Sequence, residues 1–330
     1  MVKFFSIDNS LVINSRKTAA SLAAFPSYKL SSREYAQMLE PNNTLERYLV
    51  VGIMQDFPVS VLQHKLKSYD AQVHFVRDQF KLVVVLFSTS QPQEFISFLS
   101  SLGADAVELT HVPDIRKAGA FVSDMDSTIV QCECIDKIAA LCGLEEQVAA
   151  ITEQAMQGKL DFVAALQERV SLLKGVQVDK FAELIAELPV MPGASELLTY
   201  LHEQKWTSVL VSGGFVPFAQ TVAQALNFTA YHANHLEEKK GVLTGKVTGT
   251  IVDAAYKEQC LASYAEQELV TIAIGDGAND IPMLDKADWA VAYYAKEKVR
   301  AHADFIVQHT DLRAVAAALE LKRQLLEMSN

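Results

Sequence analysis

Five short apolar segments recur after residue 117, and polar turns or stretches with helical spacing separate them. They span residues 118–122, 207–211, 271–274, 289–292 and 305–307. Near-continuous apolar strands that alternate with helices are typical of a parallel sheet covered on both faces. We therefore expect an α/β domain over residues 115–330, built on a Rossmann-like parallel sheet.

The interval between the first two apolar segments is too long for one crossover helix. Its residues 134–188 have helical spacing, so we interpret them as a helical cap inserted over the sheet edge. Residues 231–251 carry a turn at Lys239-Lys240-Gly241 and predict a β-hairpin.

Residues 44–114 have a different pattern, with the order β-α-β-β-α-β. The expected strands are 47–53, 71–77, 80–87 and 106–109, the expected helices are 59–68 and 95–102, and the central hairpin turn is placed at Asp78-Gln79. This order predicts a ferredoxin-like α+β domain. Residues 1–43 are weakly periodic and stay unassigned.

Charge and composition exclude several classes of protein. A net charge of -11 argues against nucleic acid or an anionic membrane as the main partner. No run of about 18 apolar residues occurs, so no membrane-spanning helix is expected. Charge interrupts the first residues too early for a secretory leader, and four cysteines are too few for a disulfide framework, so we expect the cytoplasm.

Two carboxylates, Asp124 and Asp126, directly follow the first apolar segment. In α/β sheets, ligands bind at the carboxyl ends of the strands. Two acids spaced by one residue can share a hard cation, or one can act as nucleophile while the other moves protons. The alternative is an Asx turn that caps a helix.

A second acidic pair, Asp276 and Asp280, follows the segment 271–274 and flanks small residues that let the backbone approach a ligand. Asp280 also precedes Ile281-Pro282, so it suits a helix N-cap.

The segment 207–211 ends at Ser212 and Gly213, shortly before Pro217. A hydroxyl and free amides at a helix N-terminus would bind phosphate, whereas the alternative is an ordinary glycine-rich turn. Lys257 is either a solvated residue or the fixed cation that an anion site in an acidic protein needs.

Taken in order, these segments resemble the haloacid dehalogenase-like phosphatases and, within them, the phosphoserine phosphatase family. The resemblance covers about residues 118–307, and residues 134–188 correspond to the family's helical cap. The matching segments are 124–128, 133–136, 158–162, 168–173, 191–193, 212–215 and 275–280.

The resemblance implies Mg²⁺-dependent hydrolysis of O-phospho-L-serine to L-serine and phosphate, the last step of serine biosynthesis. It implies that Asp124 becomes an aspartyl-phosphate and that Asp126 acts first as general acid and then as base. This division is chemically reasonable, because a carboxylate attacks without activation whereas an alkoxide leaving group needs a proton. The implied metal ligands are Asp124, the main-chain carbonyl of Asp126, Asp276 and, directly or through water, Asp280.

The resemblance also implies a set of substrate contacts. Glu133 would meet the ammonium group and Arg169 the carboxylate of phosphoserine. Position alone favours solvated side chains for both, and Arg169 could also lie at the edge of the apolar stripe of its cap helix. Met156 and Phe162 match positions that shield the family's pocket, or they are plain cap core. The implied contacts to the phosphoryl group are Ser212, Gly213 and Lys257, with Asn279 close by.

Two other functions stay open at this stage. One is a phosphotransferase, or a phosphatase for another small phosphorylated amino acid or alcohol; Glu133 with Arg169 favours an amino-acid substrate. The other is a phospho-accepting regulator with slow turnover, which would need neither Asp126 as an acid nor an inserted cap.

The domain over residues 44–114 resembles an ACT-like regulatory domain. Residues 55–60 lack the glycine that usually follows Asp-x-Pro in effector-binding ACT domains. We therefore expect this domain to pair subunits into a homodimer or to brace the cap.

Overall fold

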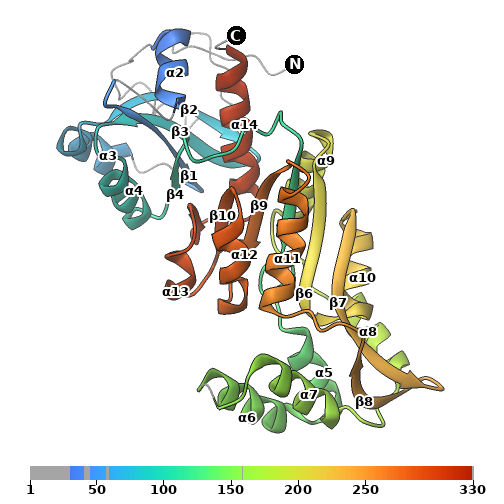
Figure 1. Ribbon diagram of the computed structural model, residues 1–330. Helices are drawn as coiled ribbons and strands as arrows, with labels where there is room; N and C mark the ends of the chain where they lie inside the picture. Colours follow the sequence, from blue (N-terminus) through green and yellow to red (C-terminus); the bar gives the residue numbers. More distant parts are fainter. Residues whose placement is uncertain (1–29, 41–44, 57–58, 158, 329–330) are drawn as a thin grey trace. The chain divides into compact units, whose positions relative to one another are not determined.

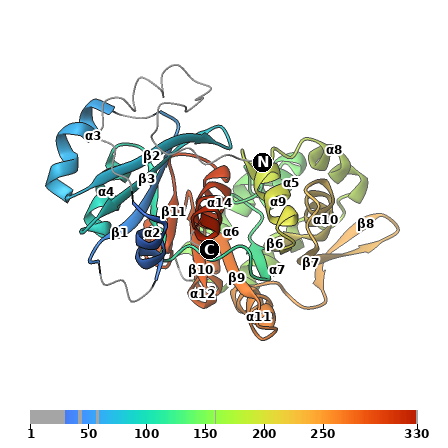
Figure 2. The same ribbon diagram turned by 90° about the horizontal axis from the view of Figure 1, so that it is seen from above.

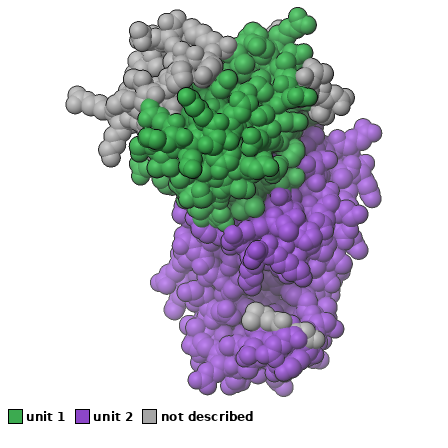
Figure 3. Space-filling model, turned by 90° about the vertical axis from the view of Figure 1, so that its left-hand side faces the viewer, with its two compact units in different colours: residues 1–117, 304–330 green, residues 118–303 purple. Residues whose placement is uncertain are grey.

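A computed structural model describes residues 30–40, 45–56, 59–157 and 159–328 (Figure 1). The chain divides into two compact units, one of residues 1–117 with 304–330 and one of residues 118–303 (Figure 3). Residues 304–330, which the strand pattern groups with the catalytic domain, therefore belong to the same unit as the amino-terminal part. None of the described helices has the length and apolarity to cross a membrane.

The first unit contains a four-stranded antiparallel sheet of order β2-β3-β1-β4. Its elements have the order β-α-β-β-α-β: β1 (Tyr48–Met54), α3 (Val59–Lys65), the 3-10 helix η1 (Leu66–Tyr69), β2 (Gln72–Gln79), β3 (Leu82–Thr89), α4 (Pro92–Ser101) and β4 (Asp105–Glu108). One sheet face packs with α4 in a core that includes Val50, Val85 and Phe87 from the sheet and Phe95 and Leu99 from the helix. Residues 57–58 of the segment compared with ACT domains lie outside the described residues.

The hairpin turn between β2 and β3 is at Phe80-Lys81, two residues beyond the expected Asp78-Gln79. Strand β2 continues to Gln79, which pairs with Leu82. Phe80 and Lys81 have φ values of 51° and 62°, and two consecutive residues with positive φ are the geometry of the favoured two-residue hairpin turn.

Helices α2 (Ser32–Leu39) and α14 (Arg313–Met328) also belong to this unit. α14 contacts α2, β1 and β3. Side chains alternate between the two faces of a strand, so Leu49, Val51 and Leu86 lie on the face opposite the α3/α4 core, and all three are fully buried. α2 falls in the part that the sequence left unassigned. A capping box between Ser31 and Glu34 starts it.

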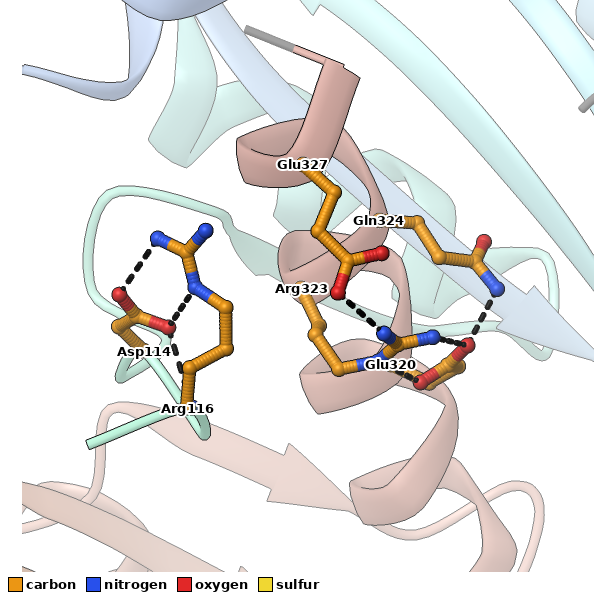
Figure 4. Close-up of polar contacts among 6 residues, drawn as sticks. All are labelled: Asp114, Arg116, Glu320, Arg323, Gln324 and Glu327. Atoms are coloured by element: carbon orange, nitrogen blue, oxygen red, sulfur yellow. Dashed lines mark hydrogen bonds and ion pairs between the residues drawn. The ribbon is translucent and has the colours of Figure 1, made fainter. Parts of the chain in front are cut away.

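Charged side chains near the carboxyl terminus form short ion pairs within this unit (Figure 4). Arg323 Nε lies 2.6 Å from Glu320 Oε2, and Arg323 also pairs with Glu327. Arg116 pairs separately with Asp114 at 2.8 Å. These arginines are thus already paired with carboxylates.

The second sheet has seven strands in the order β11-β10-β9-β5-β6-β7-β8. They are β5 (Gly119–Ser123), β6 (Thr207–Phe215), β7 (Ala230–Lys239), β8 (Val242–Thr248), β9 (Val270–Gly275), β10 (Trp289–Tyr293) and β11 (Phe305–Val307). β5 pairs in parallel with β6 and β9, and β9 with β10, whereas β7 and β8 form an antiparallel hairpin. The expected α/β fold with a parallel sheet is confirmed.

Helices cover both faces of this sheet (Figure 2). One face carries α9 (Ala194–Glu203) and α10 (Val216–Ala225), and the other carries α11 (Ala254–Ala265) and α12 (Ile281–Lys286). Between β5 and α9, the chain forms a separate group of helices (Figure 1). These are α5 (Cys134–Cys142), α6 (Glu145–Met156), α7 (Phe162–Leu172), the 3-10 helix η2 (Val178–Lys180) and α8 (Phe181–Ala186), which we call the cap.

Candidate active site

The carboxyl end of β5 places Asp124 and Asp126 in a tight turn. The backbone N–H of Asp124 still donates to Ile274 of β9 at 3.1 Å. The chain then folds back, because the amides of Ile129 and Val130 both donate to the carbonyl of Met125. Both carboxylates therefore lie at the edge of the sheet where parallel strands end.

Lys257, on α11, lies between two of the predicted acids. Its Nζ is 2.6 Å from Asp124 Oδ1 and 2.7 Å from Asp280 Oδ1, and all three residues are buried. Burial alone would lower the pKa of Lys257, but the two carboxylates outweigh burial and raise this pKa. Lys257 is therefore a fixed internal cation, and the solvated alternative is wrong.

Asp280 occupies a space that only glycine leaves open. A Cβ atom on Gly275 would lie 2.4 Å from the Asp280 carboxyl group. Asp280 Oδ2 accepts from the Gly277 amide at 3.0 Å, while Oδ1 accepts from Lys257. Asp280 occupies the expected N-cap position of α12, but its side chain makes no capping hydrogen bond to that helix.

Three carboxylates converge into a group that can hold a metal ion. Single oxygen atoms of Asp124, Asp276 and Asp280 all lie within 4.8 Å of one another. Burial, and then the charge of Asp280, raise the pKa of Asp276 to about 6, and the same two causes raise the pKa of Asp124. Three hard carboxylates share a single lysine here, and carboxylate oxygens are ligands that fit a divalent cation such as Mg²⁺.

Asp126 stands slightly apart from this group. Its Oδ1 accepts from the backbone N–H of Cys134 at 3.1 Å, and its Oδ2 lies so close to Gly214 that a Cβ there would be only 2.9 Å away. Burial raises the pKa of Asp126 to about 7, and the charge of Glu133 adds to this effect. A carboxyl group with this pKa can both donate and accept a proton near neutral pH.

Ser212 and Gly213 lie within β6, whereas α10 begins only at Val216. The sequence pattern suggested that their amides lie at a helix N-terminus, and this expectation is wrong. The pairing of β6 with β7 shifts in register between Val211 and Phe215, which allows the strand to continue past its regular part. Ser212 is fully buried, and its Oγ accepts from the Gly214 amide at 2.8 Å.

Asn234, on β7, joins two parts of the site. Its side-chain amide donates to the Gly213 carbonyl at 2.8 Å, and its Oδ1 accepts from the Val252 amide at 2.9 Å. Val252 directly precedes Asp253, which caps α11, the helix that carries Lys257. Asn234 is fully buried and so fixes Gly213 relative to the start of α11.

Replacing Asn234 by alanine should destabilise the protein, because the Gly213 carbonyl and the Val252 amide would lose their partner. An unsatisfied buried group costs about 1–3 kcal/mol, so we expect the melting temperature to fall by several degrees. Thermal unfolding of Asn234→Ala beside His235→Ala, an exposed neighbour on the same strand, measures this effect. Equal melting temperatures for the two variants would contradict the bridging role.

The cap contributes the other expected substrate residues. Glu133 is exposed at the start of α5 and accepts from Ser127 Oγ at 2.9 Å. Arg169 is half-buried on α7, where burial lowers its pKa. The Phe162 ring lies against Gly213, since a Cβ on Gly213 would be 3.1 Å from it. The side chain of Met156 lies outside the described part of the structure.

A cavity of about 210 Å³ brings most of these groups together. Its lining includes Asp124, Asp126, Glu133, Phe162, Arg169, Gly213, Asp276 and Asn279. Ser212, Lys257 and Asp280 are buried and do not line it. The cavity is also lined by Gly214 and Lys296, which the sequence analysis did not select. Gly214 stands in the Ser-Gly-Gly segment and could have been found there, whereas Lys296 belongs to no recognisable motif.

The fold and the acidic site define a haloacid dehalogenase-like hydrolase. Residues 121–285 match a family model of the haloacid dehalogenase-like hydrolases, and residues 258–319 match a second model with that description. The phosphoserine phosphatase of Haemophilus influenzae is 36% identical over 299 residues, which cover 89% of this chain and 93% of the relative. The chain belongs to the phosphoserine phosphatase family of these hydrolases.

Other comparisons agree with this family. The phosphoserine phosphatase of Vibrio cholerae is 41% identical over 240 residues, covering 72% of this chain and 73% of that protein. The crystal structure of a probable phosphoserine phosphatase from Vibrio cholerae, in unliganded form, has a TM-score of 0.79 and 32% identity. That similarity covers 94% of this chain and 95% of the solved one, so it includes both units.

Proposed function

We propose that this protein hydrolyses O-phospho-L-serine to L-serine and phosphate through an aspartyl-phosphate at Asp124. The observation that carries the proposal is one cavity lined by the Asp124–Asp126 pair and by Glu133 and Arg169 from the cap. A solved structure described as a phospho-aspartyl intermediate analogue of phosphoserine phosphatase is 37% identical, with a TM-score of 0.57. It covers 61% of this chain.

In the first step, a carboxylate oxygen of Asp124 attacks phosphorus while the bond from phosphorus to the serine oxygen breaks. Asp126 gives its proton to that oxygen, so serine leaves as a neutral alcohol. In the second step, Asp126 takes a proton from a water molecule that attacks the aspartyl-phosphate. The bond from phosphorus to Asp124 breaks, and phosphate is released. A pKa of about 7 suits Asp126 to both roles.

We assign the metal site to Mg²⁺, held by Asp124, Asp276, the main-chain carbonyl of Asp126 and, directly or through water, Asp280. When bound, the ion offsets the repulsion between the carboxylates and the phosphoryl group. Thr128 supports this site, because its Oγ1 donates to Asp276 at 3.3 Å.

We assign the phosphoryl contacts to Gly213, with Asn279 beside it, on the cavity lining, and to Ser212 and Lys257, which are buried next to the lining residues Gly213 and Asp124. Lys257 is preorganised for this task, because its ammonium group is already fixed between two carboxylates before substrate arrives. At the cap end of the cavity, Glu133 binds the substrate ammonium group and Arg169 its carboxylate. Phe162, packed near Gly213, excludes water from the bound substrate.

The alternatives are weaker on structural grounds. A phospho-accepting regulator does not need a cap over its acidic site or a second acid such as Asp126 in the same cavity. No observation favours transfer to another alcohol over transfer to water. Phosphate release from phosphoserine, measured with and without Mg²⁺, tests the proposal directly. An intact substrate after long incubation with Mg²⁺ would reject it.

The amino-terminal domain is proposed to be ACT-like, supported by its element order and by the strand order β2-β3-β1-β4. We propose that it pairs two chains into a homodimer.

The cysteines at positions 132, 134, 142 and 260 are free thiols, which supports a reducing compartment such as the cytoplasm.

Replacing Arg169 by alanine should lower kcat/KM for phosphoserine by roughly two orders of magnitude, because a charge-assisted contact to the substrate carboxylate is lost. An aryl phosphate has no such carboxylate and should be affected far less. The measurement is the ratio of kcat/KM for the two substrates, with the exposed neighbour Gln167→Ala on α7 as control. An unchanged ratio would contradict the role of Arg169 in recognition, and an equal loss for both substrates would instead assign Arg169 to cap stability.

A further inference from the structure

A fourth strand end also supplies a side chain to the cavity. Lys296 lines the cavity and follows β10 by three residues. β10 runs parallel to β9, with Ala292 opposite Gly275, so the segments after both strands leave the sheet at the same edge. Lys296 therefore comes from the core side of the cavity, next to the strand that carries Asp276.

The backbone of Lys296 is held by hydrogen bonds, whereas its side chain is exposed. Its carbonyl accepts from the amides of Val299 at 2.9 Å and Arg300 at 3.2 Å, and Arg300 Nε donates to Ala295 at 2.7 Å. The side chain is exposed. Among the described residues, no carboxylate forms an ion pair with its ammonium group. Lys296 thus presents an exposed ammonium group at the cavity from a hydrogen-bonded stretch of backbone.

Acidic side chains outnumber basic ones around the cavity, so a cation there would help to attract an anionic substrate. Four carboxylates line it, whereas Arg169 and Lys296 are the basic side chains among the described residues that do so. Lys257 is buried and already paired with two carboxylates, and Arg169 belongs to the cap. A phosphate monoester that approaches a protein with a net charge of -11 is repelled at long range.

We propose that Lys296 binds the phosphoryl group at the cavity mouth, both when the substrate enters and when inorganic phosphate leaves. This inference rests on the proposed phosphatase function and adds a binding residue to it. Lys257 holds the phosphoryl group in its reacting position. Lys296 binds the same group earlier, as it enters from solvent, and later, as phosphate is released. The contact is to phosphate and not to the amino-acid part of the substrate, because Lys296 follows the strand next to the one that leads to Asp276 and is not part of the cap.

The test compares Lys296→Ala, Lys296→Arg and a matched control, Lys298→Ala, whose exposed side chain on α13 (Glu297–Arg300) does not line the cavity. For each variant, kcat and KM are measured with phosphoserine and with an aryl phosphate, together with the inhibition constant of inorganic phosphate. Thermal unfolding checks that the exposed substitutions leave the fold intact.

We expect Lys296→Ala to raise both KM values and the phosphate inhibition constant about tenfold, the effect of losing one partly exposed charge-assisted contact. We expect kcat to change less than about threefold, because Lys257 keeps its place. Lys296→Arg should restore most of the loss, and added salt should weaken binding less in the alanine variant than in the wild type.

Several outcomes would overturn the proposal. These are unchanged constants in Lys296→Ala, a loss confined to phosphoserine, or an equal loss in Lys298→Ala. The second would place Lys296 on the substrate carboxylate, and the third would indicate only a general charge effect. Phosphate inhibition and aryl phosphate hydrolysis report on Lys296 even if phosphoserine is not the substrate, so the two proposals can fail separately.

Discussion

The variant Asp124→Asn should lose turnover of phosphoserine by at least roughly 10⁴-fold, because an amide cannot attack phosphorus as a carboxylate does. The substitution also removes one negative charge from the acidic group that we assign to Mg²⁺. A second consequence is that no phosphate should become covalently attached to the protein. Steady-state phosphate release and the intact mass of the acid-quenched protein measure the two effects.

The control for this variant is Asp179→Asn, which removes an exposed carboxylate of the cap. It should retain wild-type turnover. Residual activity of Asp124→Asn within a hundredfold of the wild type, or a phosphorylated protein mass, would contradict the nucleophile assignment.

Asp126→Asn should slow the release of serine from phosphoserine by roughly 10²–10⁴-fold, the usual contribution of a general acid. An aryl phosphate has a better leaving group, so its first step should suffer less. Its second step should still slow, because no base remains to activate water. Rapid-quench measurements that separate alcohol release from phosphate release distinguish these steps.

The pH dependence of the first step follows from the same residue. Burial raises the pKa of Asp126 to about 7, so the protonated form persists to higher pH than for an ordinary aspartate. The rate of serine release in a single turnover should therefore fall as pH rises through about 7. Asp126→Asn should lack this decrease. A wild-type rate that is flat from pH 6 to pH 8.5, or a variant that retains the decrease, would assign the proton transfer to another group.

Strands β5, β6, β9 and β10 could be predicted because each is a short apolar segment with a polar or glycine-rich end, whereas β7 and β8 could be predicted only as a hairpin, from the turn at Lys239-Lys240-Gly241. The cap could be predicted because residues 134–188 are far longer than a crossover helix. The exact extent of β6 could not, since a register shift against β7 lets the strand continue through Ser212 and Gly213. The length of β6 therefore depends on its pairing with β7, which comes later in the sequence.

α2 was missed although its capping box is visible as Ser31-x-x-Glu34. The packing of α14 with the amino-terminal part could not be read from its own residues, because an amphipathic helix does not specify which apolar face it covers.

The acids of the site could be predicted because they occur as pairs directly after apolar strands, and the structure places them at one sheet edge. Lys257 could be proposed only because an acidic protein that binds an anion needs a cation, since a single lysine has no pattern of its own. Asn234 and Lys296 needed the structure for the same reason. The role of Asn234 depends on two backbone groups, at Gly213 and Val252, that lie far apart in the chain.

The division of the chain affects the order in which its parts can fold during synthesis. The catalytic unit is one continuous segment, 118–303, whereas the other unit is assembled from residues at both ends of the chain. At about 5–20 residues per second, the ribosome needs roughly 10–40 s after residue 117 to reach α14. Until then, the sheet face with Leu49, Val51 and Leu86 lacks the helix that covers it. Nascent chains that stall in this interval would therefore expose this apolar sheet face although the continuous segment 118–303 is already synthesised.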